Sequence, residues 1–272
     1  MAQRLKGRAG YPSDEPFRPG TEHLDKLDEP LRWRKPRRMF VCSMGDLFHD
    51  EVPDKYIAEI FGVMAQTSRR EPPSKLWPNG RTIIGTPNVR YGPHTFMVLT
   101  KRPQRALKLL TSTIFRGLVA SAAFRHAHNR IDAGHLSHQI GVREEYGRCY
   151  EPGRLWPLPN VWVGVTAEDQ QRADERIPLL LKIPAAVRFV SVEPMLEEID
   201  DFGMTRFDWL ICGGETGPGA RPMDISWARR LRDRCAAAGV PFFFKKPGSH
   251  RWAPRETPAD LDIRQFPEVN HG

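Results

Sequence analysis

The chain has 272 residues, 40% of them hydrophobic, which is enough to bury the core of one large α/β domain. It carries 41 lysines and arginines against 33 aspartates and glutamates, so its formal net charge is +8 and favours an anionic small molecule or a nucleic acid as partner. No apolar run approaches the ~20 residues of a membrane span, and Met1 is not followed by the apolar stretch of a signal peptide. We therefore expect no membrane association and a cytoplasmic location.

The cysteines and histidines do not form an evident metal site. The cysteines lie far apart in the sequence, and no two have the spacing of metal ligands. They are Cys42, Cys149, Cys212 and Cys235. Cys42 and Cys212 lie in apolar strand contexts, which predicts buried thiols in a reducing compartment. Several histidines lie near one another, but no carboxylate or cysteine completes a ligand set, so we predict no metal. These histidines are His126, His128, His135 and His138.

The first part of the chain predicts one strand and one helix between irregular segments. Residues 1–37 are a polar lead-in rich in proline and charge. A strand is predicted at 39–44, and an amphipathic helix follows from Pro53 to about Ser68. Residues 69–93 contain so many prolines and glycines that we interpret them as an insertion.

The middle of the chain repeats this arrangement. A strand is predicted at 95–100 and a helix from Gln104 onward, followed by a second irregular insertion at 114–156. The next strand is predicted at 161–166. The helix after it is expected to run from Ala167 to Ile177 and to stop at Pro178.

Three more strands follow, at 187–192, 207–212 and 240–244. Asp224 is placed to cap the helix before the last of them. From Gly248 onward the sequence is polar, and we expect the tail at 249–272 to be loosely attached.

Alternating strands and helices predict an α/β fold with a parallel sheet and right-handed crossovers. An open doubly wound sheet is the alternative, but its G-x-G-x-x-G fingerprint is missing. We therefore predict an incomplete parallel (β/α) barrel over residues 38–248, interrupted by the two insertions.

Polar or charged residues follow each predicted strand. In a parallel barrel the C-terminal ends of the strands converge on one rim, where ligands bind. The sequence therefore predicts a ligand site there, with Glu193 and Glu215 as candidate catalytic groups. The candidate ligand-binding residues are Ser43, Asp46, Thr100, Lys101, Arg102, Thr166, Glu168, Glu193, Gly213, Gly214, Glu215, Arg221 and Lys245.

On the motifs described above, the chain resembles a protein family found in phages and bacteria, the phage gene-product thirty-seven/sixty-eight proteins. This family is regarded as radical-SAM-like. The similarity covers most of residues 38–248 except the insertions. The matching segments are Ser43–His49, Leu99–Pro103, Leu158–Thr166, Ala185–Phe189, Glu193–Pro194, Gly213–Pro222 and Phe242–Lys245.

The resemblance implies a [4Fe–4S] cluster and S-adenosylmethionine as cofactors, but members of the family hold the cluster with closely spaced cysteines in a segment that precedes the part matched here. The sequence from Met1 resembles the family downstream of that segment. We therefore expect a barrel whose first strand and cluster loop are missing, through a late start codon, a split gene that puts them on a partner protein encoded nearby, or real loss.

The resemblance also implies roles for the rim. Glu193 and Glu215 would hydrogen-bond ribose or amine groups, and backbone donors would come from Gly213 and Gly214. The basic side chains would meet carboxylate or phosphate groups; these are Lys101, Arg102, Arg221 and Lys245.

Two other functions stay open at this point, and enzymatic activity itself is undecided. The positive charge fits a phage accessory protein that binds nucleic acid through a basic rim. An acid–base enzyme could use Glu193 or Glu215 as its base, although no nucleophile–base pair is identifiable from spacing.

Overall fold

The computed structural model describes residues 24–33, 35–42, 45–68, 94–127, 140, 144–145, 148–149, 155–200, 206–249 and 256–268. The chain divides into two compact units. The first unit comprises Met1–Arg37, His49–His94 and Thr113–Arg154. The second comprises Arg38–Phe48, Thr95–Ser112 and Leu155–Gly272. The insertion predicted at 69–93 lies outside the described residues.

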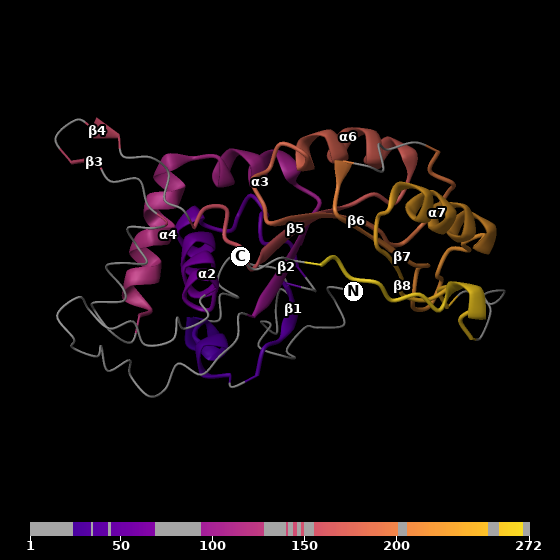
Figure 1. Cartoon of the computed structure of the whole chain (residues 1–272), viewed down its shortest axis with the longest axis horizontal. Coiled ribbons are helices and arrows are strands. Elements are labelled where there is room, and N and C mark those ends of the chain that lie inside the picture. Colours follow the sequence, from indigo (N-terminus) through magenta and orange to yellow (C-terminus); the bar gives the residue numbers. More distant parts are fainter. Residues whose placement is uncertain are drawn as a thin grey trace. The chain divides into compact units, whose positions relative to one another are not determined.

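The second unit is built on a six-stranded, entirely parallel sheet. The strands lie side by side in their order along the chain, and the sheet curls into half of a barrel (Figure 1). The parallel α/β fold predicted from the sequence is thus confirmed, whereas the described strands do not close a complete barrel. The strands are β1 (Arg38–Val41), β2 (Thr95–Thr100), β5 (Val161–Thr166), β6 (Val187–Val192), β7 (Trp209–Cys212) and β8 (Phe242–Phe244).

The strands at 95–100, 161–166 and 187–192 have the bounds predicted from the sequence. β1 is shorter than expected because Cys42 takes a φ of 53°, in the left-handed region that ends an extended strand. The thiol of Cys42 is exposed, so the expectation that it is buried is wrong. Cys212, on β7, is fully buried as expected.

Three helices connect these strands: α3 (Pro103–Leu110), α6 (Gln170–Leu180) and α7 (Ile225–Ala238). Figure 1 shows α3 and α6 along the same face of the sheet, and α6 packs on β5. Asp224 caps α7 as predicted, with its side chain accepting from the N–H of Ser226. The expectation that Pro178 stops the preceding helix is wrong, because α6 starts after its N-cap Asp169 and includes Pro178 near its end.

Large apolar side chains fill one face of the sheet. Cross-strand partners share this face, as Trp162 and Val187 do, and so do Gly164 and Phe189. A Cβ on Gly164 would lie 2.4 Å from the ring of Phe189, so this position requires glycine. The buried members of this core are Met97, Trp162, Val187, Phe189, Trp209 and Ile211.

The C-terminal tail is attached to this sheet, contrary to expectation. The backbone N–H of Phe244 donates to Ile263, and that of Gln265 donates to Phe242, so the tail pairs with the free edge of β8. The ring of Phe266 packs on Trp209 at a centroid distance of 5.1 Å. These contacts hold residues 256–268 against the sheet because an open strand edge and an apolar face are both covered.

The first unit contains a packed helix pair, α2 (Asp54–Gln66) and α4 (Thr113–Arg125), which lie side by side in Figure 1. α2 confirms the helix predicted from Pro53, whereas α4 shows that the second insertion begins with a regular helix. The two backbones approach closely at Gly62, where a Cβ would lie 2.6 Å from the Cβ of Ala122. The unit also holds two short 3-10 helices, η1 (Leu24–Lys26) and η2 (Glu29–Arg32), and an antiparallel pair, β3 (Glu144–Glu145) and β4 (Arg148–Cys149).

Candidate ligand site at the C-terminal edge of the sheet

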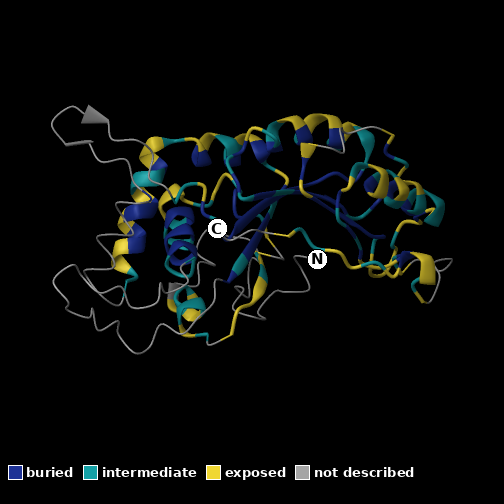
Figure 2. Cartoon of the chain, viewed as in Figure 1, coloured by how far each residue is buried: buried dark blue, intermediate teal, exposed yellow. Residues whose placement is uncertain are grey.

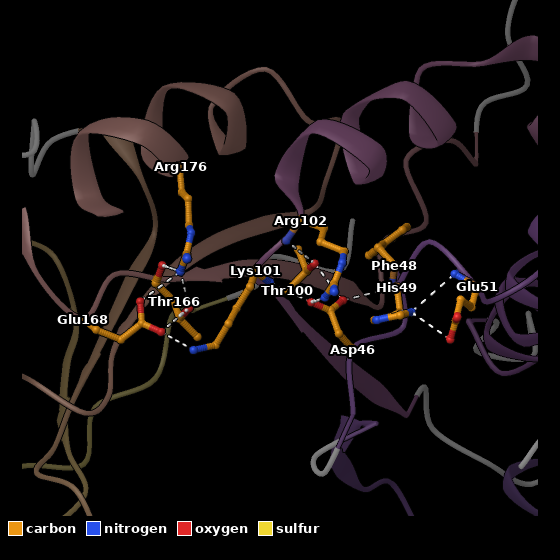
Figure 3. Close-up of polar contacts among 10 residues, drawn as sticks. All are labelled: Asp46, Phe48, His49, Glu51, Thr100, Lys101, Arg102, Thr166, Glu168 and Arg176. Carbon is orange, nitrogen blue, oxygen red and sulfur yellow. Dashed lines mark hydrogen bonds and ion pairs between the residues drawn. The ribbon is translucent and has the colours of Figure 1, made fainter. Parts of the chain in front are cut away.

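The residues after β1 and β2 are tied together by Asp46 (Figure 3). One oxygen of its carboxylate accepts from the hydroxyl of Thr100 at 2.8 Å, and the other accepts from the backbone N–H of Lys101 at 2.8 Å. The guanidinium of Arg102 lies 3.3 Å from the same carboxylate. Asp46 therefore fixes the segment after β2 and pairs with Arg102.

Glu168, after β5, lies at the centre of a second cluster. Its carboxylate pairs with the ammonium group of Lys101 from the neighbouring strand β2 and accepts from the hydroxyl of Thr166 at 3.2 Å. Burial would raise the pKa of Glu168, but the hydrogen bond from Lys101 and the charges of Lys101 and Arg176 outweigh it and hold that pKa below its usual value. Glu168 is therefore a buried, ionised carboxylate that positions the ammonium group of Lys101.

Arg176 was not predicted as a site residue. From α6, its guanidinium donates to Glu168 at 2.9 Å and to the hydroxyl of Thr166 at 2.7 Å (Figure 3). A sequence signal did exist: Arg176 lies among the buried residues Ala173, Ile177 and Leu180 on one side of α6. A cation in such an apolar stripe needs a buried anionic partner.

Glu193 and Lys245 pair across the other half of the sheet edge. The ammonium group of Lys245, after β8, lies 3.1 and 3.2 Å from the two carboxylate oxygens of Glu193, after β6. The lysine side chain is 54% exposed and the glutamate 21%, so this pair faces solvent more than the cluster around Glu168 does.

Gly213 and Gly214 do not offer free backbone donors, and that expectation is wrong. The N–H of Gly213 donates to the carbonyl of Val192, and that of Gly214 donates to the carbonyl of Lys246. Close packing explains the second glycine instead, since a Cβ on Gly214 would lie 2.4 Å from the carbonyl oxygen of Pro247.

Glu215 and Arg221 form a two-pronged ion pair within the loop after β7. The guanidinium nitrogens lie 2.8 and 2.9 Å from the two carboxylate oxygens, and the backbone N–H of Arg221 donates to the same carboxylate at 2.8 Å. These bonds lower the pKa of Glu215 to about 2. The bonds to Glu215 raise the pKa of Arg221, and the charge of Glu168 adds a smaller contribution.

The edge of the sheet thus brings together most of the predicted site residues. Backbone bonds connect neighbouring loops, with Leu196 donating to Glu168 and Met195 donating to Gly213. Every predicted site residue that is described lies in the second unit; Ser43 lies outside the described residues.

The described cysteines do not fit an iron–sulfur cluster, which needs thiolates held close together. Cys42 is exposed at the end of β1, whereas Cys212 and Cys235 are buried on β7 and α7. Burial raises the pKa of Cys235 to about 12 and also raises that of Cys212, so both are protonated at neutral pH. Among the described residues, no group of three His, Cys, Asp or Glu side chains could hold a metal ion.

The histidine cluster considered from the sequence is described only in part. His126 lies in the first unit, and its ring pairs with the carboxylate of Glu59 at 2.8 Å. His128, His135 and His138 lie outside the described residues. In the part of the chain that the structure describes, no single helix is long and apolar enough to cross a membrane.

The fold and the site define an α/β protein with a parallel half-barrel and a charged C-terminal strand edge. The chain belongs to the family described as "Protein of unknown function (DUF5131)", which it matches over residues 1–71 and 88–266. The unmatched residues between these segments fall within the insertion predicted at 69–93. No curated protein and no solved structure matches the chain.

Proposed function

We propose that the C-terminal edge of the half-barrel binds a small nucleoside-type ligand, with S-adenosylmethionine the compound that the radical-SAM-like resemblance implies. The observation that carries this proposal is the contact network that joins the ends of neighbouring strands. Lys101 reaches Glu168 from the next strand, and Lys245 reaches Glu193 across β7. Such groups at the carboxyl ends of parallel strands are placed to bind a ligand.

The finer fold assignment belongs to the same proposal: the half-barrel is an incomplete (β/α) barrel, with no strand before β1 among the described residues. The burial of the strands supports it. β5 is buried at every residue, whereas β1 alternates exposed and half-buried residues, as the dark blue and yellow segments of Figure 2 show. A strand inside a barrel is covered on both faces and both edges.

Iron–sulfur chemistry would need cysteine ligands other than the described ones, which do not fit a cluster. The residues of the edge itself can bind and orient a ligand. Lys101 and Lys245 offer ammonium donors, and Glu193 offers a carboxylate that is partly open to solvent. Glu215 is a poor candidate for a general base, because a carboxylate whose pKa is about 2 has little affinity for a proton at neutral pH.

The nucleic-acid alternative is weaker than the net charge suggests. Helix α7 carries a row of arginines, but these side chains pair with carboxylates or carbonyls of the same unit. Arg229 and Arg232 bind Asp260, and Arg230 binds Glu198. Cations that are already paired contribute less to the phosphate contacts on which nucleic-acid affinity depends.

Binding of S-adenosyl-L-homocysteine, measured by isothermal titration calorimetry, tests the proposal. We expect saturable binding by the whole chain, weakened at least about tenfold by Glu193→Ala, a loss of roughly 1.4 kcal/mol. Lys246→Met is the matched control, because Lys246 is exposed beside Lys245 and belongs to none of the pairs described above. Absence of binding would refute the proposal. Steeply salt-dependent retention of single-stranded DNA would favour the alternative.

A further inference from the structure

Two lysines from distant strands reach toward the middle of the sheet edge. Lys101 follows β2 and pairs with Glu168 at the end of β5. Lys245 follows β8 and pairs with Glu193 at the end of β6, which requires its side chain to pass the end of β7. The two side chains therefore extend toward each other from opposite sides of the same edge.

Their carboxylate partners lie on adjacent strands. β5 and β6 pair directly, with Thr166 opposite Ser191, and neighbouring strands are about 4.8 Å apart. The backbone N–H of Leu196, after β6, also donates to the carbonyl of Glu168 at 2.9 Å. The two carboxylates, and the ammonium groups paired with them, thus lie at the ends of adjacent strands.

Each ammonium group keeps donors for a ligand. An ammonium group has three N–H donors, and the carboxylates of Glu168 and Glu193 use only part of them. Lys101 is 55% exposed and Lys245 54%, so both groups reach solvent. Lys101 is the more firmly placed of the two, because Arg176 and Thr166 hold its partner Glu168.

The ion-paired groups at the ends of β5 and β6 leave one positive charge uncompensated. Two carboxylates, of Glu168 and Glu193, face three cations, of Lys101, Lys245 and Arg176. Each of the two outer ion pairs, Asp46 with Arg102 and Glu215 with Arg221, has a net charge of zero. A ligand group with a single negative charge would neutralise the region, whereas a group with two or more would bring an excess of negative charge close to Glu168 and Glu193.

We propose that Lys101 and Lys245 together bind one carboxylate group of the ligand, and that the site selects a monoanionic group over polyanionic ones. This inference rests on the proposed function, since it names the chemistry of the ligand at the same edge. The two oxygens of a carboxylate can accept one hydrogen bond from each ammonium group. Glu168 and Glu193 orient the donors and oppose additional negative charge.

A titration of the whole chain with simple carboxylates tests this selectivity. Lysine labelled isotopically at Cε reports the surroundings of each ammonium group by NMR, and single Lys→Met variants assign the signals. Acetate, succinate and citrate are added at equal ionic strength. We expect acetate to move the signals of Lys101 and Lys245 together and saturably, while the signal of Lys246 stays in place; Lys101→Met should abolish the saturable shift at Lys245.

Two results of the carboxylate titration would overturn the inference. One is a shift without saturation that all three lysines share, which is ionic screening only. The other is binding of succinate or citrate at least about tenfold tighter than acetate. The proposed function fails separately, if acetate binds both lysines but S-adenosyl-L-homocysteine does not bind. Conversely, S-adenosyl-L-homocysteine binding that leaves both lysine signals unmoved would retain the function and reject the inference.

Discussion

The two halves of the sheet edge use the same pair of residue types in different ways. In the first half, Glu168 is buried and bonded to Lys101, Thr166 and Arg176. In the second half, Glu193 is more exposed and bonded to Lys245. A carboxylate whose acceptor sites are filled within the protein keeps its neighbours in place, whereas an exposed one can exchange its partner for a ligand. The first half is thus a fixed support, and the second half is the part able to rearrange.

The largest expected effect is a loss of stability, which should be much greater when the carboxylate of the first half is removed than when that of the second half is removed. Glu168→Ala leaves Arg176 buried without its carboxylate, which should lower the free energy of unfolding by about 3–5 kcal/mol. Glu193→Ala removes a more exposed partner and should cost about 0–1 kcal/mol. Urea denaturation of both variants measures the difference, and equal losses would contradict the distinction between the halves.

Packing in the second half gives the next effect. Gly214→Ala places a methyl group against the backbone of Pro247 and should cost about 1–3 kcal/mol, through overpacking that the backbone cannot relieve without moving. Gly213→Ala is the matched control, since its nearest contact would be 3.3 Å, to a carboxylate oxygen of Glu193. Thermal unfolding should show the smaller loss for Gly213→Ala, and the reverse order would show that the loop after β8 adapts.

Replacing either lysine of the sheet edge should change stability less than the substitutions above. Lys101→Met and Lys245→Met each remove a side chain that is more than half exposed, so each should change the free energy of unfolding by about 0–1 kcal/mol. Lys101→Met should cost more, because it leaves the buried Glu168 with one cation fewer. If Lys245→Met proved the more destabilising in urea denaturation, Glu193 rather than Glu168 would be the structural carboxylate.

The smallest effect is a pH dependence of the second half. The pKa of Glu215 is about 2 in the folded chain and 4.5 ordinarily, so its contribution to stability is complete above about pH 4.5 and is lost as the pH falls toward 2. Glu215→Gln should therefore lower the thermal midpoint more at pH 7 than at pH 2.5, where part of the contribution has been lost. A difference between the two proteins that is the same at both pH values would contradict the pairing with Arg221.

Much of the framework was predictable because it depends on local patterns. The buried strands at 161–166 and 187–192 are apolar runs bounded by polar residues, and Asp224 precedes an amphipathic helix. The position expected for the candidate site followed from the parallel topology alone.

The pairing of the site residues was not predictable, because it depends on tertiary contacts. Nothing near Lys101 in the sequence indicates Glu168, and the role of Gly214 becomes evident only when Pro247 lies against it. The attachment of the tail was not predictable for a similar reason. Its sequence is mostly polar, and its few apolar residues, such as Leu261 and Phe266, make contacts with residues far away in the chain.

The attachment of the tail has a consequence for how the protein is made. The ring of Phe266 lies under the guanidinium of Arg38, the first residue of β1, at 4.0 Å. Contacts between residues far apart in a sequence form late and slow the search for the folded state. During synthesis, β8 therefore keeps an unpaired edge until Ile263 and Gln265 have emerged from the ribosome, and a truncation before these residues should yield a product prone to edge-to-edge aggregation.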